Sequence, residues 1–118
     1  MKIDIERSYD IVDKPKTASR YLVDRLWPRG LTKERLQLDL WVKEFSPSDD
    51  LRKWYNHDPK KWEQFKERYY RELSRKSEEV EKFLAVIKNF EKVVLIYSSA
   101  ERDINNARAL KEYLIEDQ

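Results

Sequence analysis

The heptapeptide DRLWPRG, which begins at Asp24, carries the side chains best suited to bind an anion. Arg25 and Arg29 can each donate two parallel hydrogen bonds to a carboxylate or phosphate, and Trp27 offers a face for stacking. Asp24 is a candidate for proton transfer. Gly30, the chain's only glycine, is expected where the backbone adopts a positive φ. The alternative is structural, because an Arg beside an Asp is also typical of an ion-pair brace beneath a tight turn.

This heptapeptide lies in a basic part of the chain. Residues 14–35 contain seven basic and two acidic side chains, whereas the whole chain has 25 Lys and Arg against 23 Asp and Glu, a net charge of +2. The local excess predicts attraction of an anionic small molecule. Nucleic acid is an alternative partner, but we do not favour it because the overall charge is too small to indicate phosphate-backbone binding.

A second polar group follows the apolar run KVVLIY, where Ser98 and Ser99 precede an expected helix. Small residues at a strand end allow close approach of a ligand, and a helix N-terminus favours negative charge. The alternative is that Ser99 or Asp103 only caps that helix. Since neither a Gly-rich phosphate loop nor a G-x-S-x-G motif is present, Ser98 is a weak candidate for a nucleophile.

His57 is the chain's single histidine, and histidine side chains titrate near neutral pH. Its neighbour Asp58 precedes a proline and is better explained as a helix N-cap than as the acid of a catalytic pair. We therefore treat His57 as a candidate for proton transfer or ligand contact, with a structural hydrogen bond near the cap as the alternative.

Four segments have strand patterns. Residues 2–7 alternate apolar and polar side chains, which predicts a strand covered on one face. Residues 21–23 and 92–97 are β-branched and aromatic runs, typical of strands buried on both faces. Residues 36–42 alternate again and indicate a fourth strand, although a short helix is a competing assignment.

Helix signals fill the middle and the end of the chain. Ser48 and Ser77 are predicted N-caps, and Asp58 followed by proline predicts the start of a long helix. Residues 104–114 have the apolar spacing of a final helix. The long helix has one apolar stripe that we assign to the core, formed by Trp62, Phe65, Tyr69 and Leu73. We predict an α/β fold over residues 1–118, a single compact domain in which helices flank a mostly parallel or mixed sheet of about four strands.

Composition excludes several functional classes. The absence of Cys excludes disulfides, thiol nucleophiles and Cys-based metal centres, and one His excludes a His-rich metal site. We expect no cofactor and no metal. No apolar run approaches the roughly 20 residues that cross a bilayer, and the first residues lack a signal peptide's apolar core. We therefore expect a cytoplasmic protein without a membrane partner.

Several motifs are shared with one known family. They are LVDRLWPRGL from Leu22, LDLWVKE from Leu38, HDP from His57 and NNA from Asn105. Together they resemble the YeaO-like family (domain of unknown function 488) of small bacterial and archaeal proteins over almost the whole chain. The resemblance implies a compact α/β domain but no reaction. The polar residues of its signature are Asp24, Arg25, Arg29, Lys43 and His57.

The last loop departs from the family pattern. Ser98 and Ser99 stand where an Ala pair is usual, and Ile104 stands where a His precedes Asn-Asn-Ala. This departure puts in doubt any mechanism that needs that His. Asn105 and Asn106 remain, and two adjacent Asn on the first turn of a helix could hydrogen-bond either a ligand or the neighbouring arginine-containing loop.

Our favoured hypothesis is a pocket at the carboxyl ends of the strands that binds an anionic or nucleotide-like small molecule, with or without catalysis. His57 and Asp24 are its candidate catalytic groups. The candidate ligand-binding residues are Arg25, Trp27, Arg29, Lys43, Ser98, Asn105 and Asn106. The hypothesis requires that the loops containing Trp27 and Ser98 lie at the same end of the sheet.

Two other functions stay open from the sequence. A nucleic-acid or protein-binding module would use the basic residues 14–35, and its affinity would depend strongly on salt. An assembly role would place Trp and Tyr side chains at an oligomer interface, but the oligomeric state is not predicted.

Overall fold

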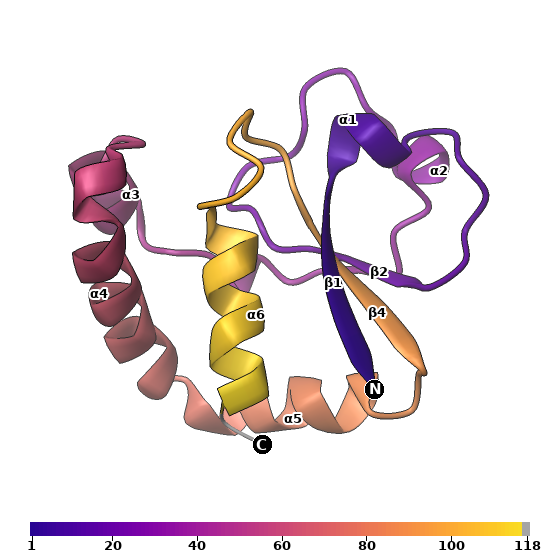
Figure 1. The fold of residues 1–118 in the computed structure, drawn as a ribbon. Helices are drawn as coiled ribbons and strands as arrows, with labels where there is room; N and C mark the ends of the chain where they lie inside the picture. The colour runs from indigo at the N-terminus through magenta and orange to yellow at the C-terminus, as the bar shows by residue number, and fades with distance from the viewer. Residues whose placement is uncertain (117–118) are drawn as a thin grey trace.

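Four parallel strands form the sheet in the computed structural model, which describes residues 1–116 (Figure 1). They are β1 (Lys2–Arg7), β2 (Ser19–Leu22), β3 (Leu40–Trp41) and β4 (Lys92–Tyr97), in the order β1-β4-β2-β3. All three pairings are parallel. The predicted α/β fold is therefore confirmed, with a fully parallel sheet whose four carboxyl ends lie along one edge.

Position in the sheet explains the strand sequences. β4 lies between β1 and β2, and it is buried from Val93 to Tyr97, as its apolar run predicts. β1 is an outer strand in which only Ile3 is buried, while Ile5 is partly buried against the larger core cluster. The predicted strand at residues 36–42 is shorter than expected, because only Leu40 and Trp41 pair with β2.

A short helix takes the first part of that predicted strand. The hydroxyl of Thr32 accepts the Arg35 backbone N–H at 3.2 Å and starts α2 (Lys33–Leu36). Gln37 then ends the helix in the left-handed conformation, with φ of 52°. The competing assignment of a short helix is therefore correct only for Leu36, because the rest of α2 precedes the predicted strand.

The other helices lie on both sides of the sheet. They are α1 (Ser8–Ile11), α3 (Asp49–Tyr55), α4 (Trp62–Ser74), α5 (Ser77–Ile87) and α6 (Asn106–Glu116), with 3₁₀ segments η1 (Lys43–Phe45) and η2 (Pro59–Lys61). Neither α1 nor η1 is predicted by the sequence patterns. None of the helices within the described residues is long and apolar enough to cross a membrane.

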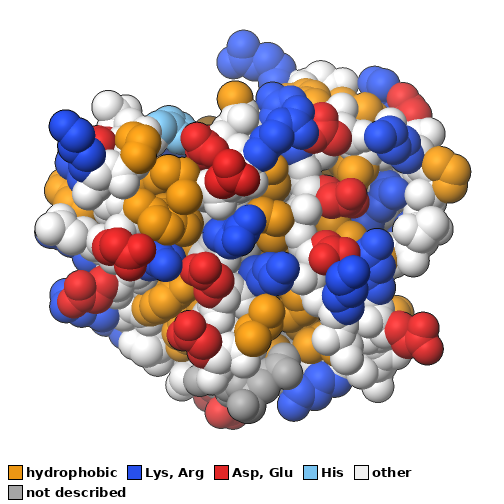
Figure 2. Space-filling view, viewed as in Figure 1, with side chains coloured by type: hydrophobic (Ala, Val, Ile, Leu, Met, Phe, Trp, Pro, Cys, Tyr) orange, Lys and Arg blue, Asp and Glu red, His pale blue; other side chains and the backbone are white. Residues whose placement is uncertain are grey.

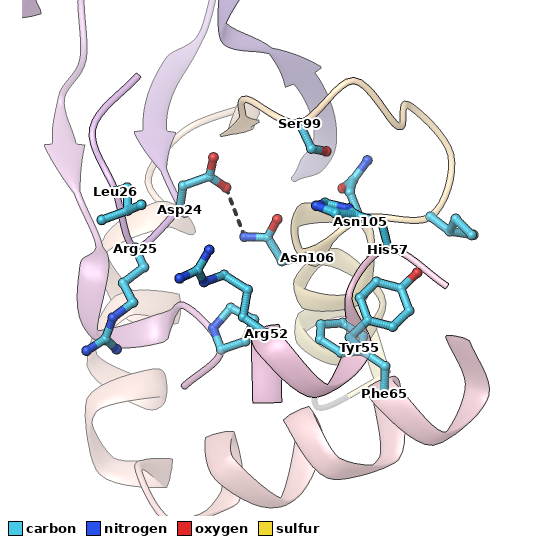
Figure 3. Close-up of a pocket in the computed structure, with 12 residues that line it drawn as sticks. Asp24, Arg25, Leu26, Arg52, Tyr55, His57, Phe65, Ser99, Asn105 and Asn106 are labelled. Carbon is cyan, nitrogen blue, oxygen red and sulfur yellow. Dashed lines mark hydrogen bonds between the residues drawn. The ribbon is translucent and has the colours of Figure 1, made fainter. Parts of the chain in front are cut away.

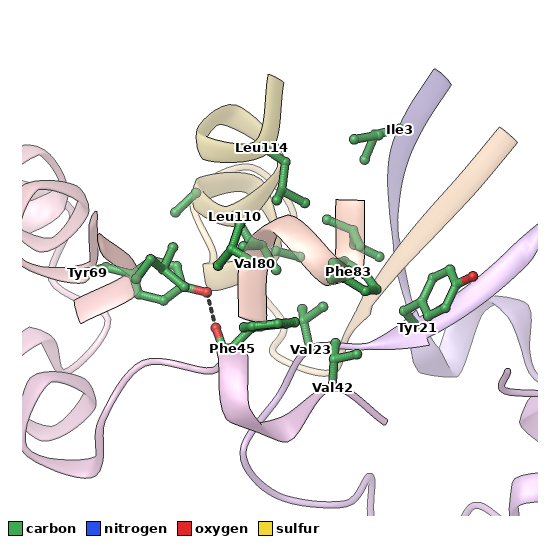
Figure 4. Packing of buried hydrophobic residues seen from close by; sticks show 14 of the residues in the cluster. Ile3, Tyr21, Val23, Val42, Phe45, Tyr69, Val80, Phe83, Leu110 and Leu114 are labelled. Carbon is green, nitrogen blue, oxygen red and sulfur yellow. Dashed lines mark hydrogen bonds between the residues drawn. The ribbon is translucent and has the colours of Figure 1, made fainter. Parts of the chain in front are cut away.

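Alternating strand residues divide the core into two clusters. Tyr21, Val93 and Leu95 pack on one face with the apolar sides of α3 to α6 (Figure 4). Leu22 and Val94 pack on the other face with residues from α1 and α2. The stripe assigned to the core of α4 lies in the larger cluster, in which Phe65, Tyr69 and Leu73 are buried and Trp62 is partly buried.

Two predicted helix starts agree with the structure. The hydroxyl of Ser48 accepts the Leu51 backbone N–H at 3.1 Å and caps α3. The carboxylate of Asp58 accepts the Lys60 backbone N–H at 3.0 Å and caps η2, which leads directly into α4.

Two predicted caps are wrong. Ser77 is the first residue of α5 rather than its cap, and Lys76 occupies the cap position without a side-chain hydrogen bond. The residue that caps α6 is Asn105, whose Oδ1 accepts the Arg108 backbone N–H at 2.8 Å, and neither Ser99 nor Asp103 does so. Both errors are shifts along the chain, so the helices themselves lie where the apolar spacing predicts.

Candidate anion-binding site

Asp24 ties the loop after β2 to the loop after β4 (Figure 3). Its Oδ2 accepts the backbone N–H of Ser98 at 2.9 Å, and its Oδ1 accepts the Nδ2–H of Asn106 at 3.0 Å. Asn106 also donates to the Val23 carbonyl at 3.0 Å. The two loops that the sequence singles out therefore lie at the same end of the sheet, which meets the requirement of the favoured hypothesis.

The electrostatics of Asp24 reflect this position. Burial raises the pKa of Asp24, because a covered carboxylate loses hydration, while the hydrogen bonds from Asn106 and Ser98 act in the opposite direction. Both carboxylate oxygens accept a hydrogen bond from the protein. The geometry therefore gives Asp24 a positioning role between three chain segments.

A pocket of about 200 Å³ adjoins this tie (Figure 3). Of the sequence-predicted site residues, it brings together Asp24, Arg25, His57, Asn105 and Asn106. Its other lining residues are Leu26, Pro47, Arg52, Tyr55, Phe65, Ser99 and Ile104. The pocket thus combines cations, amides and an apolar surface at the carboxyl ends of β2 and β4.

Two arginines supply the positive charge of the pocket. Arg52 lies on α3, and its Nη2 donates to Asp49 Oδ1 at 2.6 Å, so its charge is already paired. Hydrogen bonds from Arg52 and Lys53 lower the pKa of Asp49 to about 2. Arg25 is exposed and makes no ion pair with any residue from 1 to 116. Arg25 therefore presents an uncompensated charge at the pocket.

His57 reaches the pocket through a strained turn at the end of α3. Asn56 and His57 both have left-handed backbones, with φ of 46° and 55°. The imidazole is exposed, and its centroid lies 6.4 Å from that of the Tyr55 ring. Because the Asp58 carboxylate caps η2, it does not orient His57, and no catalytic pair is formed between these neighbours.

The asparagines have separate roles. Asn105 is buried, donates to the Glu101 carbonyl at 3.0 Å and caps α6, so both its amide nitrogen and its amide oxygen have partners within the protein. Asn106 bonds the loop after β2 rather than standing free. Of the two possibilities that the sequence leaves open, the contact with the neighbouring loop is therefore the one formed by Asn106.

Trp27 and Lys43 lie outside the pocket. The Trp27 Nε1–H donates to the Leu31 carbonyl at 2.6 Å, and its ring meets Trp41 edge-on at 5.4 Å. The ammonium of Lys43 lies 5.1 Å from the centre of the Trp41 ring. These residues form an aromatic corner beside β3 that is separate from the pocket lining.

Arg29 and Ser98 do not line the pocket either. Arg29 is exposed further along the loop, where its carbonyl accepts the Tyr9 hydroxyl at 2.9 Å. The Ser98 hydroxyl lies 2.8 Å from that of Ser8. Gly30 has φ of 81°, as predicted, and this conformation lets the loop turn after the arginines.

A wider cleft of about 600 Å³ shares Arg25 with the pocket. Its other cations are Lys43, Arg75 and Lys76. Two acids, Glu44 and Glu72, also line it. Glu72 accepts the Ser48 backbone N–H at 2.8 Å and the Ser48 hydroxyl at 2.6 Å. The cleft extends the positive surface beyond the pocket.

Part of the basic excess of residues 14–35 is compensated by acids outside the segment. Arg35 pairs with Asp13 at 2.7 Å, and Lys16 pairs with Asp39 at 2.6 Å. Arg20 is buried and donates to the Leu36 carbonyl at 2.9 Å. Acidic and basic side chains are likewise interspersed over the face shown in Figure 2. Within residues 1–116, no three acidic, His or Cys side chains lie close enough to hold a metal ion.

Sequence reasoning missed Arg52 and Tyr55 as pocket residues. They lie three positions apart on α3, and this spacing puts both side chains on one helix face. His57, a sequence-predicted site residue, follows Tyr55 by two positions. The helical spacing of Arg52 and Tyr55 just before it was therefore the signal that could have identified them. The apolar wall at Ile104 had no such signal beyond its departure from the family pattern.

Comparisons with known proteins identify the same family that the sequence motifs resemble. The family model described as the inactive DUF488-N3 subclade matches residues 2–118. The chain is 38% identical over 114 residues to the uncharacterised protein YeaO of Escherichia coli (strain K12), covering 97% of each chain. It is 39% identical over 72 residues to the uncharacterised protein Rv3073c of Mycobacterium tuberculosis (strain H37Rv), which covers 61% of this chain and 60% of that relative. No solved structure gives a significant match.

Proposed function

This chain belongs to the YeaO-like DUF488 family, and from that premise we propose that it binds a small anionic molecule without converting it. The observation that carries the proposal is the unpaired Arg25 guanidinium at a pocket formed by the carboxyl ends of β2 and β4. In open α/β sheets this edge is the usual place for ligands. A guanidinium can hold a carboxylate or phosphate with two parallel hydrogen bonds.

The size of the pocket limits the ligand. A volume of about 200 Å³ is below the roughly 300 to 1,000 Å³ that is typical for pockets of drug-sized ligands. One arginine is free and the second is paired with Asp49, so the site suits a single anionic group. We therefore expect a carboxylate or monophosphate attached to a small organic body.

Three features argue for binding without turnover. Asp24 already accepts two hydrogen bonds, and the hydroxyl of Ser98 lies against that of Ser8 rather than against a base. His57 lacks an orienting acid. Ile104 lines the pocket where the family pattern has a His, and the matching subclade is described as inactive. Together these features leave no nucleophile with an activating base among the pocket residues.

The wider cleft supports capture of an anion. Arg25 lines both the pocket and the cleft, and Lys43 and Arg75 line the cleft. The positive potential therefore continues from the cleft to the pocket. A basic depression of this kind raises the local concentration of anions. Nucleic-acid binding by residues 14–35 has less support, because Lys16 and Arg35 are already paired with acids.

Isothermal titration calorimetry with benzoate and phenyl phosphate tests the proposal. We expect saturable binding to the wild type and a loss of about tenfold or more in Arg25→Gln, since hydrogen bonds to charged groups contribute roughly 1.5 to 3 kcal/mol. Arg29→Gln is the matched control, because it removes the same charge from the same loop outside the pocket. Absence of saturable binding, or an equal loss in both variants, would contradict the proposal.

A further inference from the structure

The hydroxyl of Tyr55 is a buried polar group of the pocket that has no hydrogen-bond partner within the described residues. Tyr55 is 6% exposed, and its ring stacks on Phe65 with centroids 4.4 Å apart. The comparable hydroxyl of Tyr69 donates to the Phe45 carbonyl. Buried polar groups are rarely left unpaired in folded proteins. Arg108 Nε is the other such atom within residues 1–116, but it lines neither the pocket nor a neighbouring cleft, so the Tyr55 hydroxyl is the one placed to meet a bound molecule.

The surroundings of this hydroxyl define which partner fits. Burial raises the pKa of Tyr55, and the negative charges of Glu101 and Asp58 raise it further. The phenol is therefore neutral and donates its proton in a hydrogen bond. The same two carboxylates disfavour a second negative charge beside it, so the acceptor on the ligand should be neutral.

The two ends of the pocket thus have different preferences. Arg25 and Leu26 lie on one flank in Figure 3, and Tyr55 and His57 lie on the other. Ile104 adds apolar surface to the pocket lining, where an imidazole would have offered a further donor or acceptor. An anion is favoured at the Arg25 flank, and a neutral acceptor is favoured at the Tyr55 flank.

We propose that the ligand is a small ring-containing monoanion with a neutral oxygen acceptor on the side of the ring away from its charge. Hydroxylated aromatic carboxylates are the simplest members of this class. The carboxylate binds Arg25, the ring lies against the apolar wall, and the neutral oxygen accepts the proton of the Tyr55 hydroxyl. This inference rests on the proposed anion binding and adds the second recognition point.

Access to the hydroxyl involves a surface side chain. His57 is exposed and lines the same pocket, with its ring centroid 6.4 Å from that of Tyr55. Rotation of exposed side chains is fast and needs no backbone change. Movement of His57 would therefore let a ligand approach the phenol while the core side of Tyr55 stays packed.

Calorimetric titration with two matched pairs of acids tests the inference. The pairs are 3-hydroxybenzoate with 3-methylbenzoate and 4-hydroxybenzoate with 4-methylbenzoate, which place the acceptor at two positions and replace it with a methyl group of similar size. We expect at least one hydroxy acid to bind the wild type about two- to tenfold more tightly than its methyl partner. In Tyr55→Phe, this preference should vanish while the methyl acids bind equally well or better.

The outcomes separate the inference from the proposed function. Binding without any preference for a hydroxy acid, or a preference that persists in Tyr55→Phe, would overturn the inference and leave anion binding intact. If none of the four acids binds the wild type, both proposals are wrong. The wild-type comparison by itself decides the matter if the variant does not fold.

Discussion

Tyr55 and Tyr69 both bury a hydroxyl group in the larger core cluster, but of the two only that of Tyr69 has a hydrogen-bond partner among residues 1–116. We expect Tyr69→Phe to lower the free energy of unfolding by about 1 to 3 kcal/mol, because it leaves the buried Phe45 carbonyl unpaired. Tyr55→Phe removes an unpaired group and should leave stability unchanged or raise it by about 1 kcal/mol. Urea denaturation measures both.

The two variants control for each other, since each removes one hydroxyl from a packed ring. A loss in Tyr55→Phe as large as that in Tyr69→Phe would mean that the Tyr55 hydroxyl has a partner within the protein. The recognition role inferred for it would then lose its basis.

Asp24 should give the protein an unusual pH dependence. Because burial raises its pKa above the ordinary value of 3.8, the folded state binds this proton more tightly than the unfolded state does. Lowering the pH from about 7 to about 4.5 should therefore increase the stability of the wild type relative to Asp24→Asn. Acidic groups whose pKa is lowered in the folded state, such as Asp49, contribute less to the free energy of unfolding as the pH falls. This loss is the same in both proteins, so it cancels in the difference.

Chemical denaturation of wild type and Asp24→Asn at the two pH values measures that difference. A difference that stays constant, or that moves in favour of Asp24→Asn as the pH falls, would show that the hydrogen bonds from Ser98 and Asn106 outweigh burial. Asp24 would then be held as a carboxylate.

At the residue scale, the sequence identifies Asp24, Arg25 and His57 because rare polar types cluster around strand ends and turns. It cannot show that Trp27 is turned away, since the hydrogen bond from its indole to Leu31 depends on the path of the loop. Nor can composition reveal that Lys43 lies over Trp41, because this contact depends on how the chain turns from β3 into η1.

At the scale of elements, α3 positions the pocket through Ser48. The hydroxyl of Ser48 caps the helix and donates to Glu72 on α4 at 2.6 Å, and its backbone N–H binds the same carboxylate. Ser48→Ala should lower the free energy of unfolding by about 2 kcal/mol, through loss of the cap and of a charge-assisted hydrogen bond. It should also weaken anion binding, because Arg52 and Tyr55 lie on this helix.

Ser74→Ala is the control for this prediction. Ser74 is exposed near the end of α4, and its hydroxyl donates to the Arg71 carbonyl at 2.7 Å within the same helix. We expect a change below about 0.5 kcal/mol in thermal or chemical unfolding. Equal losses in the two variants would show that the link between α3 and α4 contributes little.

Element predictions succeed where a long periodic pattern agrees with a local start signal, as in α4, where Asp58 and its following proline precede the apolar stripe. They fail where neighbouring residues of the chain give competing signals for a strand and for a helix. Leu36, Leu38 and Val42 are buried as their alternation suggests, whereas Leu40, the fourth residue of that pattern, is exposed. Thr32 starts and Gln37 ends a helix that includes Leu36, so the chain bends there instead of continuing as a strand. The bend depends on backbone geometry that alternation alone does not report.

At the scale of the whole molecule, the strand order is the feature furthest from local sequence. β4 enters the sheet between β1 and β2, although it follows β3 in the chain. This insertion brings Ser98 to Asp24 across 74 residues and creates the edge on which the pocket lies. Local patterns predict the existence of the strands, but only their long-range pairing decides which loops meet.

The net charge is also a property of the whole molecule. The net charge of +2 is a sum over many compensated pairs, such as Arg71 with Glu67 at 2.6 Å. Exposed pairs of this kind contribute little to stability. The functional question is therefore which cations stay unpaired, and Arg25 is the one that lies at both the pocket and the cleft.

The most direct test of anion binding is a two-dimensional ¹H–¹⁵N spectrum recorded during titration with 4-hydroxybenzoate. We expect saturable shifts of the backbone amides of Arg25, Tyr55, Ser99 and Asn106, which come from separate parts of the chain and meet only at the pocket. The same signals should respond weakly in Arg25→Gln. The account is contradicted if these amides do not shift, or if saturable shifts appear only at a surface remote from the carboxyl ends of β2 and β4.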